Sequence, residues 1–143
     1  MTLMKSVFAI GPIDHVGIRV RDRDVSVKFY EHLGFRPDPT EESPEFKATG
    51  MVNDAGARIH LIYNSMEAYP GGNVLLDQPV KWPGYTHAAF VVLDLDSMIA
   101  WLKEAHIEIT EGPVVLGDGR RRTCFVRDPD LNVLEFNELL TPH

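Results

Sequence analysis

Two stretches of the chain repeat each other and decide the fold. Residues 13–20 read IDHVGIRV, and residues 85–92 read YTHAAFVV. Both are rich in β-branched, aromatic and small apolar residues, which is typical of β-strands. His87 lies 72 residues after His15, and this spacing is kept without a gap for more than twenty residues. Such a repeat indicates an internal duplication.

Each copy continues in the same way. An aspartate-rich turn follows the first strand, and an apolar stripe at helical spacing follows over 25–33 and again over 97–105. Three short strands are then predicted in each copy, at 35–37, 46–53 and 57–64, and at 107–110, 122–127 and 132–137. The sequence therefore predicts an α+β fold of two tandem βαβββ modules, which together form a curved mixed sheet.

The two modules are expected to make one domain over residues 1–143. Module one spans about 12–64, and module two spans about 84–139. Between them, residues 65–83 are rich in proline and glycine and lack periodicity. A long irregular segment inside a compact domain is usually functional or an interface, so we predict a lid or a dimer contact, with a plain linker as the alternative.

Side-chain alternation places chemistry-bearing residues on one face of each module. On the first strand, His15 and Arg19 point away from the helix; on the matching strand, His87 does. The last strand of each module presents His60 and Glu135 on the same side. Each module thus offers two ligand-type side chains at equivalent points.

Three imidazoles and one carboxylate suit a divalent transition metal. If the two sheets curl toward each other, His15, His60, His87 and Glu135 surround a metal cavity. Nitrogen and oxygen donors without sulfur fit one Ni, Zn, Mn, Co or Fe(II) ion. Four protein ligands leave two adjacent octahedral positions for a substrate with two neighbouring oxygens, on which the metal acts as a Lewis acid.

Composition and charge narrow the possible partners. The 143-residue chain has 14 Lys and Arg against 21 Asp and Glu, a formal net charge of -7. Nucleic acids and anionic membranes attract basic surfaces, so neither is an expected partner. The opening MTLMK is too short and too weakly apolar for a secretory signal, and Cys124 is the only cysteine. A reducing, cytoplasmic location is therefore expected.

Four stretches resemble the vicinal oxygen chelate superfamily, which includes glyoxalase I, bleomycin-resistance proteins and extradiol dioxygenases. They are residues 14–20, 29–35, 85–90 and 127–135. The resemblance to glyoxalase I implies that the four ligands lie on the first and last strands of the modules. It also implies that Arg19 and Asn64 contact a glutathione moiety. Glyoxalase I has a glutamate where this chain has His60.

The resemblance supports a metal-dependent, glyoxalase I-like lyase or isomerase of the lactoylglutathione lyase type. The expected substrate is a small molecule such as a glutathione adduct, and the expected assembly is a homodimer. In this hypothesis Glu135 is the catalytic base, and His60 is an alternative base or a fourth ligand. The three arginines at 120–122 are either solvent-exposed residues at the start of a strand or ligands of a substrate carboxylate or phosphate. Of the three, Arg121 is predicted to bind the substrate.

Three alternatives stay open at the level of sequence. An Fe(II) extradiol dioxygenase would use His15, His87 and Glu135 as ligands and His60 as acid–base catalyst, although Phe125 replaces a tyrosine expected in that group. The second alternative is an epimerase or a thiol- or epoxide-opening resistance enzyme. The third is a non-catalytic binder of a small molecule. Whether modules pair within one chain or between two is also open.

Overall fold

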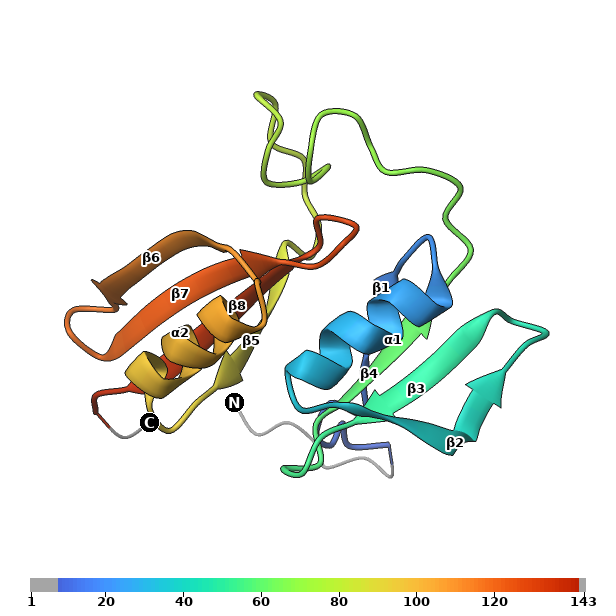
Figure 1. Cartoon of the computed structure of the whole chain (residues 1–143), viewed down its shortest axis with the longest axis horizontal. Coiled ribbons are helices and arrows are strands. Elements are labelled where there is room, and N and C mark those ends of the chain that lie inside the picture. Colours follow the sequence, from blue (N-terminus) through green and yellow to red (C-terminus); the bar gives the residue numbers. More distant parts are fainter. Residues whose placement is uncertain (1–7, 142–143) are drawn as a thin grey trace.

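Two sheets and two helices make up the computed structural model, which describes residues 8–141 (Figure 1). The expectation about a secretory signal concerns residues 1–5 and lies outside the described residues. The first module consists of β1 (Val16–Arg19), α1 (Arg23–His32), β2 (Arg36–Ser43), β3 (Ala48–Val52) and β4 (Arg58–Ile62). The second consists of β5 (His87–Val91), α2 (Leu95–Glu104), β6 (Ile109–Leu116), β7 (Arg121–Arg127) and β8 (Val133–Leu139).

The predicted duplication is confirmed by the strand order. The first sheet has the order β1-β4-β3-β2 and the second has β5-β8-β7-β6. In each, the first and last strands pair in parallel, and the other pairs are antiparallel. The first and last strands of a module are therefore direct neighbours, which is where the sequence places the candidate ligands.

The predicted α+β fold of two tandem βαβββ modules is confirmed, and each module forms its own four-stranded sheet. In each module, the strand predicted directly after the helix was too short. β2 and β6 run to Ser43 and Leu116, past the predicted ends at residues 37 and 110, and both contain prolines. Both are edge strands, where a proline costs no ladder hydrogen bond on its solvent side.

Equivalent aspartates begin the two helices. The Asp22 carboxylate accepts a hydrogen bond from the backbone N–H of Val25, and the Asp94 carboxylate accepts from that of Ser97. These caps satisfy amides that lack a partner at a helix start. Each helix packs its apolar side on its own sheet, so the opposite face of each sheet is left for other contacts.

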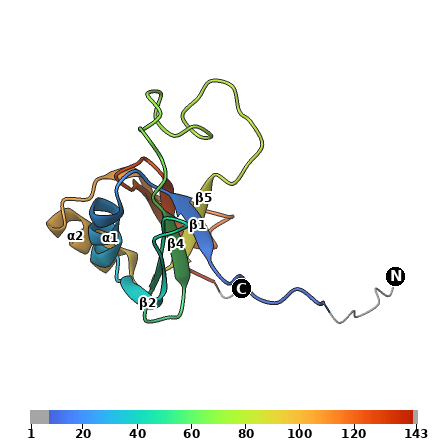
Figure 2. The ribbon, with the colours of Figure 1, turned by 90° about the vertical axis from the view of Figure 1, so that its right-hand side faces the viewer.

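The modules share one hydrophobic core on the helix side. Phe35 meets Phe90 edge to face with 5.6 Å between ring centroids, and the indole of Trp101 donates to the carbonyl of His32 across 2.5 Å. α1 and α2 lie together on one side of the sheets (Figure 2). The N-terminal segment leaves from the other side, where Phe8, Ile10 and Ile13 are exposed. Within residues 8–141, no helix combines the length and apolar character needed to cross a membrane.

A buried hydrogen bond joins the modules. The hydroxyl of Tyr30, fully buried on α1, donates to the Asp128 carboxylate across 2.8 Å. Burial raises the pKa of Asp128 above its ordinary value, while hydrogen bonds from Asn132 and Tyr30 act in the opposite direction. Asp128 also accepts from the backbone amides of Asp130 and Asn132, which fixes the turn before β8.

Removing the Tyr30 hydroxyl should weaken the junction between the modules. Tyr30→Phe leaves a buried carboxylate with one partner fewer, so the free energy of unfolding is expected to fall by about 1–3 kcal/mol. Urea unfolding followed by circular dichroism measures this. Tyr69→Phe is the matched control, because Tyr69 is 50% exposed and lies in the segment between the modules. Equal unfolding midpoints for the two variants would contradict the assigned role of the Tyr30–Asp128 bond.

Candidate metal centre

The first module brings His15 and His60 into contact. His15 directly precedes β1 and His60 is central in β4; their rings stack with centroids 3.7 Å apart and an interplanar angle of 12°. The His15 Nδ1 hydrogen-bonds Asp14 Oδ2 across 2.7 Å. Because one ring nitrogen is held in this way, Nε2 is left as the donor of His15, an arrangement typical of metal-binding histidines.

The second module brings His87 and Glu135 into contact. Nε2 of His87, at the start of β5, lies 3.3 Å from Oε1 of Glu135 in β8. The other ring nitrogen, Nδ1, hydrogen-bonds the Thr86 hydroxyl across 2.8 Å. Glu135 is 6% exposed, and its Oε2 accepts from the Asn137 amide across 2.6 Å. Both side chains of the pair are thereby fixed in orientation.

The chemistry of both pairs fits a divalent cation. Adjacent ligands bound at about 2.1 Å lie about 3 Å apart, close to the separation of His87 Nε2 and Glu135 Oε1. Burial, and after it the neighbouring His15, lowers the pKa of His60. The ring of His60 therefore stays neutral to lower pH, and the neutral ring is the form that binds metal.

The four candidate ligands form two pairs within the chain, not one cluster. Among residues 8–141, no group of three or more His, Cys, Asp or Glu is placed to hold a metal ion. The two pairs do not come together within the described part of one chain; that all four surround one metal, with the modules paired within a chain or between two, stays a prediction. The physical reason is the topology: each pair sits on its own sheet, and the two sheets are joined through their helix sides.

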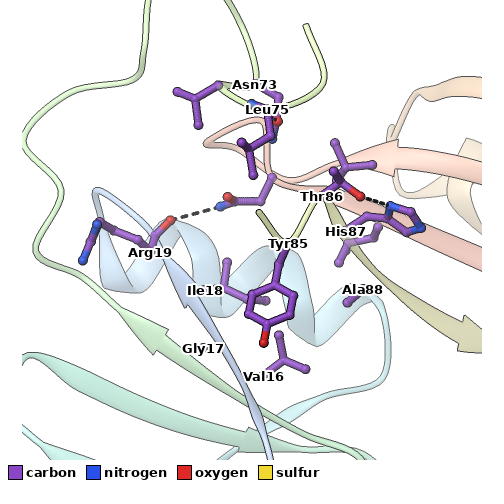
Figure 3. A pocket seen from close by; sticks show the side chains of 14 residues that line it. Val16, Gly17, Ile18, Arg19, Asn73, Leu75, Tyr85, Thr86, His87 and Ala88 are labelled. Atoms are coloured by element: carbon purple, nitrogen blue, oxygen red, sulfur yellow. Dashed lines mark hydrogen bonds between the residues drawn. The ribbon is translucent and has the colours of Figure 1, made fainter. Parts of the chain in front are cut away.

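The two residues assigned to glutathione by resemblance lie together. Arg19 Nε donates to the Asn64 side-chain oxygen across 3.0 Å. A cavity of about 230 Å³ lies between β1 and β5, lined by Gly17, Arg19, Leu75, Tyr85 and His87 among others. In Figure 3, Arg19 and His87 lie on opposite sides of this cavity with Tyr85 between them.

Arg121 lies on the same face of β7 as Phe125, four residues along the strand. Arg121 is paired with Leu139 on β8, whereas Phe125 is paired with Glu135. Arg121 therefore lies at the end of this face that is remote from Glu135. Its Nε is buried, with no hydrogen-bond partner in the part of the chain described. The neighbouring Arg122 instead faces α2 and donates to Asp96 across 2.7 Å.

Three polar residues near the pairs were not assigned from the sequence. Glu41 lies 3.8 Å from His60, and it was missed because β2 was expected to end at Pro37. Its side chain crosses Gly50, where any Cβ would come within 2.4 Å of Glu41. Asn137 was detectable, since it follows Glu135 by two residues and so shares its face. The third residue, Arg127, pairs with Asp77 and Glu111.

These features define a class of proteins with duplicated βαβββ modules that carry paired metal-type ligands on the faces opposite their helices. The chain belongs to the Glyoxalase/Bleomycin resistance protein/Dioxygenase superfamily, whose family model matches residues 12–136. Members of this superfamily act on or bind small molecules, and they typically hold a divalent metal.

Relatives and solved structures agree with this assignment. A lactoylglutathione lyase of Haemophilus influenzae is 30% identical over 131 residues, covering 87% of this chain and 90% of that protein. A virulence protein of Salmonella typhimurium is 29% identical over 134 residues, covering 90% of this chain and 85% of that protein. The fold is similar to that of a glyoxalase/dioxygenase from Nostoc punctiforme, with a TM-score of 0.74, 19% identity and 99% of each chain covered.

Proposed function

We propose that the protein is a metal-dependent, glyoxalase I-like lyase or isomerase whose site is completed by a second copy of the chain. The observation that carries the proposal is the pair of donors that each module presents at equivalent strand positions, His15 with His60 and His87 with Glu135. Two donors alone hold a divalent cation weakly. A twofold dimer that faces module one of one copy with module two of the other gives two four-ligand sites.

The surface away from the helices supports a second copy. Tyr85, just before the edge strand β5, is 101% exposed, and Val91, at the end of β5, is 62% exposed. The N-terminal segment carries further exposed apolar residues on the same side. Large exposed apolar side chains gathered on one side of a small protein are typical of an interface. The proposal keeps the cytoplasmic location expected for a chain with a single cysteine.

The residues have distinct tasks in the proposed reaction. A bound divalent cation supplies Lewis-acid stabilisation of negative charge on two neighbouring substrate oxygens. Arg19 and Asn64 orient the remainder of the substrate, for which a hemithioacetal of glutathione is the favoured candidate. Glu135 takes the proton from the carbon that bears the hydroxyl and the sulfur, and it returns a proton to the former carbonyl carbon. The product is a 2-hydroxy thioester, and no oxidant is needed.

Metal analysis and reconstitution test this function. Untagged protein stripped of metal is loaded in turn with Ni(II), Zn(II), Mn(II) or Fe(II), and each form is assayed with methylglyoxal plus glutathione and, separately, with a catechol under air. We expect one metal per chain and thioester formation with at least one of the four. Oxygen uptake with the catechol and no thioester product would replace the lyase assignment with ring cleavage.

A further inference from the structure

Arg127 lies in the same cross-strand row as the candidate ligand His87. The register places Arg127 of β7 opposite Val133 of β8, and Val133 opposite His87 of β5. Residues that stand opposite each other share a face, so Arg127 and His87 are on the same side of the sheet. With one strand between them, their backbones are about 10 Å apart. Arg127 is therefore within a short molecule's length of the proposed metal.

The Arg127 guanidinium is held by carboxylates. Nη1 contacts Asp77 Oδ2 across 2.5 Å, and Nη2 contacts Asp77 Oδ1 and Glu111 Oε1, each across 3.2 Å. The two terminal nitrogens of Arg127 thus contact the two oxygens of the Asp77 carboxylate. This is the bidentate geometry by which arginine recognises a carboxylate. Nε is buried without a hydrogen-bond partner among residues 8–141, so the guanidinium has donor capacity left.

The carboxylate that Arg127 grips comes from the segment between the modules. Residues 65–86 rise above both sheets in Figure 1. Much of the hydrogen bonding of this segment is internal: Asn73 caps the turn at Leu75, and Lys81 Nζ donates to the carbonyl of Gln78. Asp77 is one of its attachments to the second module, and the Asn73 amide, which donates to the carbonyl of Leu131, is another.

A cavity adjoins this contact. It has a volume of about 330 Å³, and its lining includes Leu76, Asp77, His87, Phe125 and Arg127. The apolar side chains lie between the Arg127 guanidinium and the candidate ligand His87, which suits a small anionic molecule, and Glu111 stays on Nη2 of Arg127. Asp77 occupies the place that the anion of such a molecule would take.

We propose that Arg127 binds a carboxylate of the substrate, and that Asp77 holds this position in the ligand-free chain as an internal substitute. An anionic ligand then displaces Asp77 and removes one of the attachments of segment 65–86 to the second module, which loosens the segment. The proposal deepens the proposed function by naming the substrate class, a carboxylate-bearing molecule, and only its link to catalysis rests on that function. The exchange costs little, since one carboxylate replaces another on the same guanidinium and the Asp77 side chain is 32% exposed.

Binding of succinate to metal-free protein, measured by titration calorimetry, tests this inference without turnover. Asp77→Asn removes the internal competitor, so succinate is expected to bind about fivefold tighter than to the wild type. Arg127→Gln removes the recognition group, and binding is expected to weaken by more than about tenfold. Asp54→Asn is the matched control: it removes the same charge from another Asp–Arg pair, with Arg36 in module one, and should leave binding unchanged.

A second readout follows the segment itself. Trypsin cleavage after Lys81 should become faster in Asp77→Asn and in wild-type protein saturated with succinate, but not with the neutral succinamide. Unchanged succinate affinity in Asp77→Asn would overturn the proposal even if Arg127→Gln misfolds. Phosphate that binds more tightly than succinate would overturn the assignment to carboxylates. Because metal and turnover are absent from these measurements, their failure leaves the lyase proposal standing, and the reverse also holds.

Discussion

Co-expressed His60→Ala and Glu135→Gln chains, purified through two different tags, are expected to regain about half of the wild-type turnover per dimer. Each variant alone is expected to be inactive, because every site of its homodimer lacks His60 or Glu135. In the mixed dimer, one site combines both lesions. The other combines an intact His15–His60 pair from one chain with an intact His87–Glu135 pair from its partner. Recovery of this kind requires ligands from two chains.

The matched control uses two lesions in the same module. A mixed dimer of His60→Ala and His15→Ala chains has a damaged first-module pair in both sites, so it should stay inactive. Metal content gives the same answer independently of activity: about one ion per dimer in the first mixture and none held tightly in the second. An inactive first mixture in verified dimers would mean that the site does not lie between chains, as would full activity in a monomer.

The sequence predicted the modules better than their relation to each other. The 72-residue repeat fixed each strand–helix unit, because local alternation and the capping residues Asp22 and Asp94 act within a few residues. The way the two sheets meet depends on contacts such as Phe35 with Phe90 and Tyr30 with Asp128. No local pattern encodes these long-range contacts, so the sequence left open whether the modules pair within one chain or between two.

The candidate site divides in the same way. Strand alternation correctly placed His15 beside His60 and His87 beside Glu135, because the first and last strands of each module pair directly. Glu41 was missed because it lies on an edge strand that continues past two prolines. Arg127 belongs to a stretch quoted for its family resemblance, and its contact with Asp77 spans fifty residues of sequence. Such contacts follow from tertiary structure alone.

Glu135→Gln is expected to reduce kcat by about 10²–10⁴-fold, the usual contribution of a general base. The amide of glutamine has the shape of the carboxylate but does not take up the substrate proton. Its oxygen can take the place of Oε2 and accept from Asn137, while its amide nitrogen takes the place of Oε1 beside His87, so the fold should be kept. Metal content measured beside kcat separates two roles. A variant that keeps the metal and loses turnover has lost the base, whereas one that loses both has lost a ligand.

Glu138→Gln is the matched control for this prediction. Glu138 lies on the same strand, three residues later and on the helix face, where its carboxylate accepts from the backbone N–H of Leu95 at the start of α2. Glutamine can accept that hydrogen bond, so kcat should be unchanged. A comparable loss of kcat in both variants would indicate damage to β8 as a whole. Full activity in Glu135→Gln would show that Glu135 is not the base. The proton would then have to be taken up by another group, such as His60, and the proposed mechanism would be wrong.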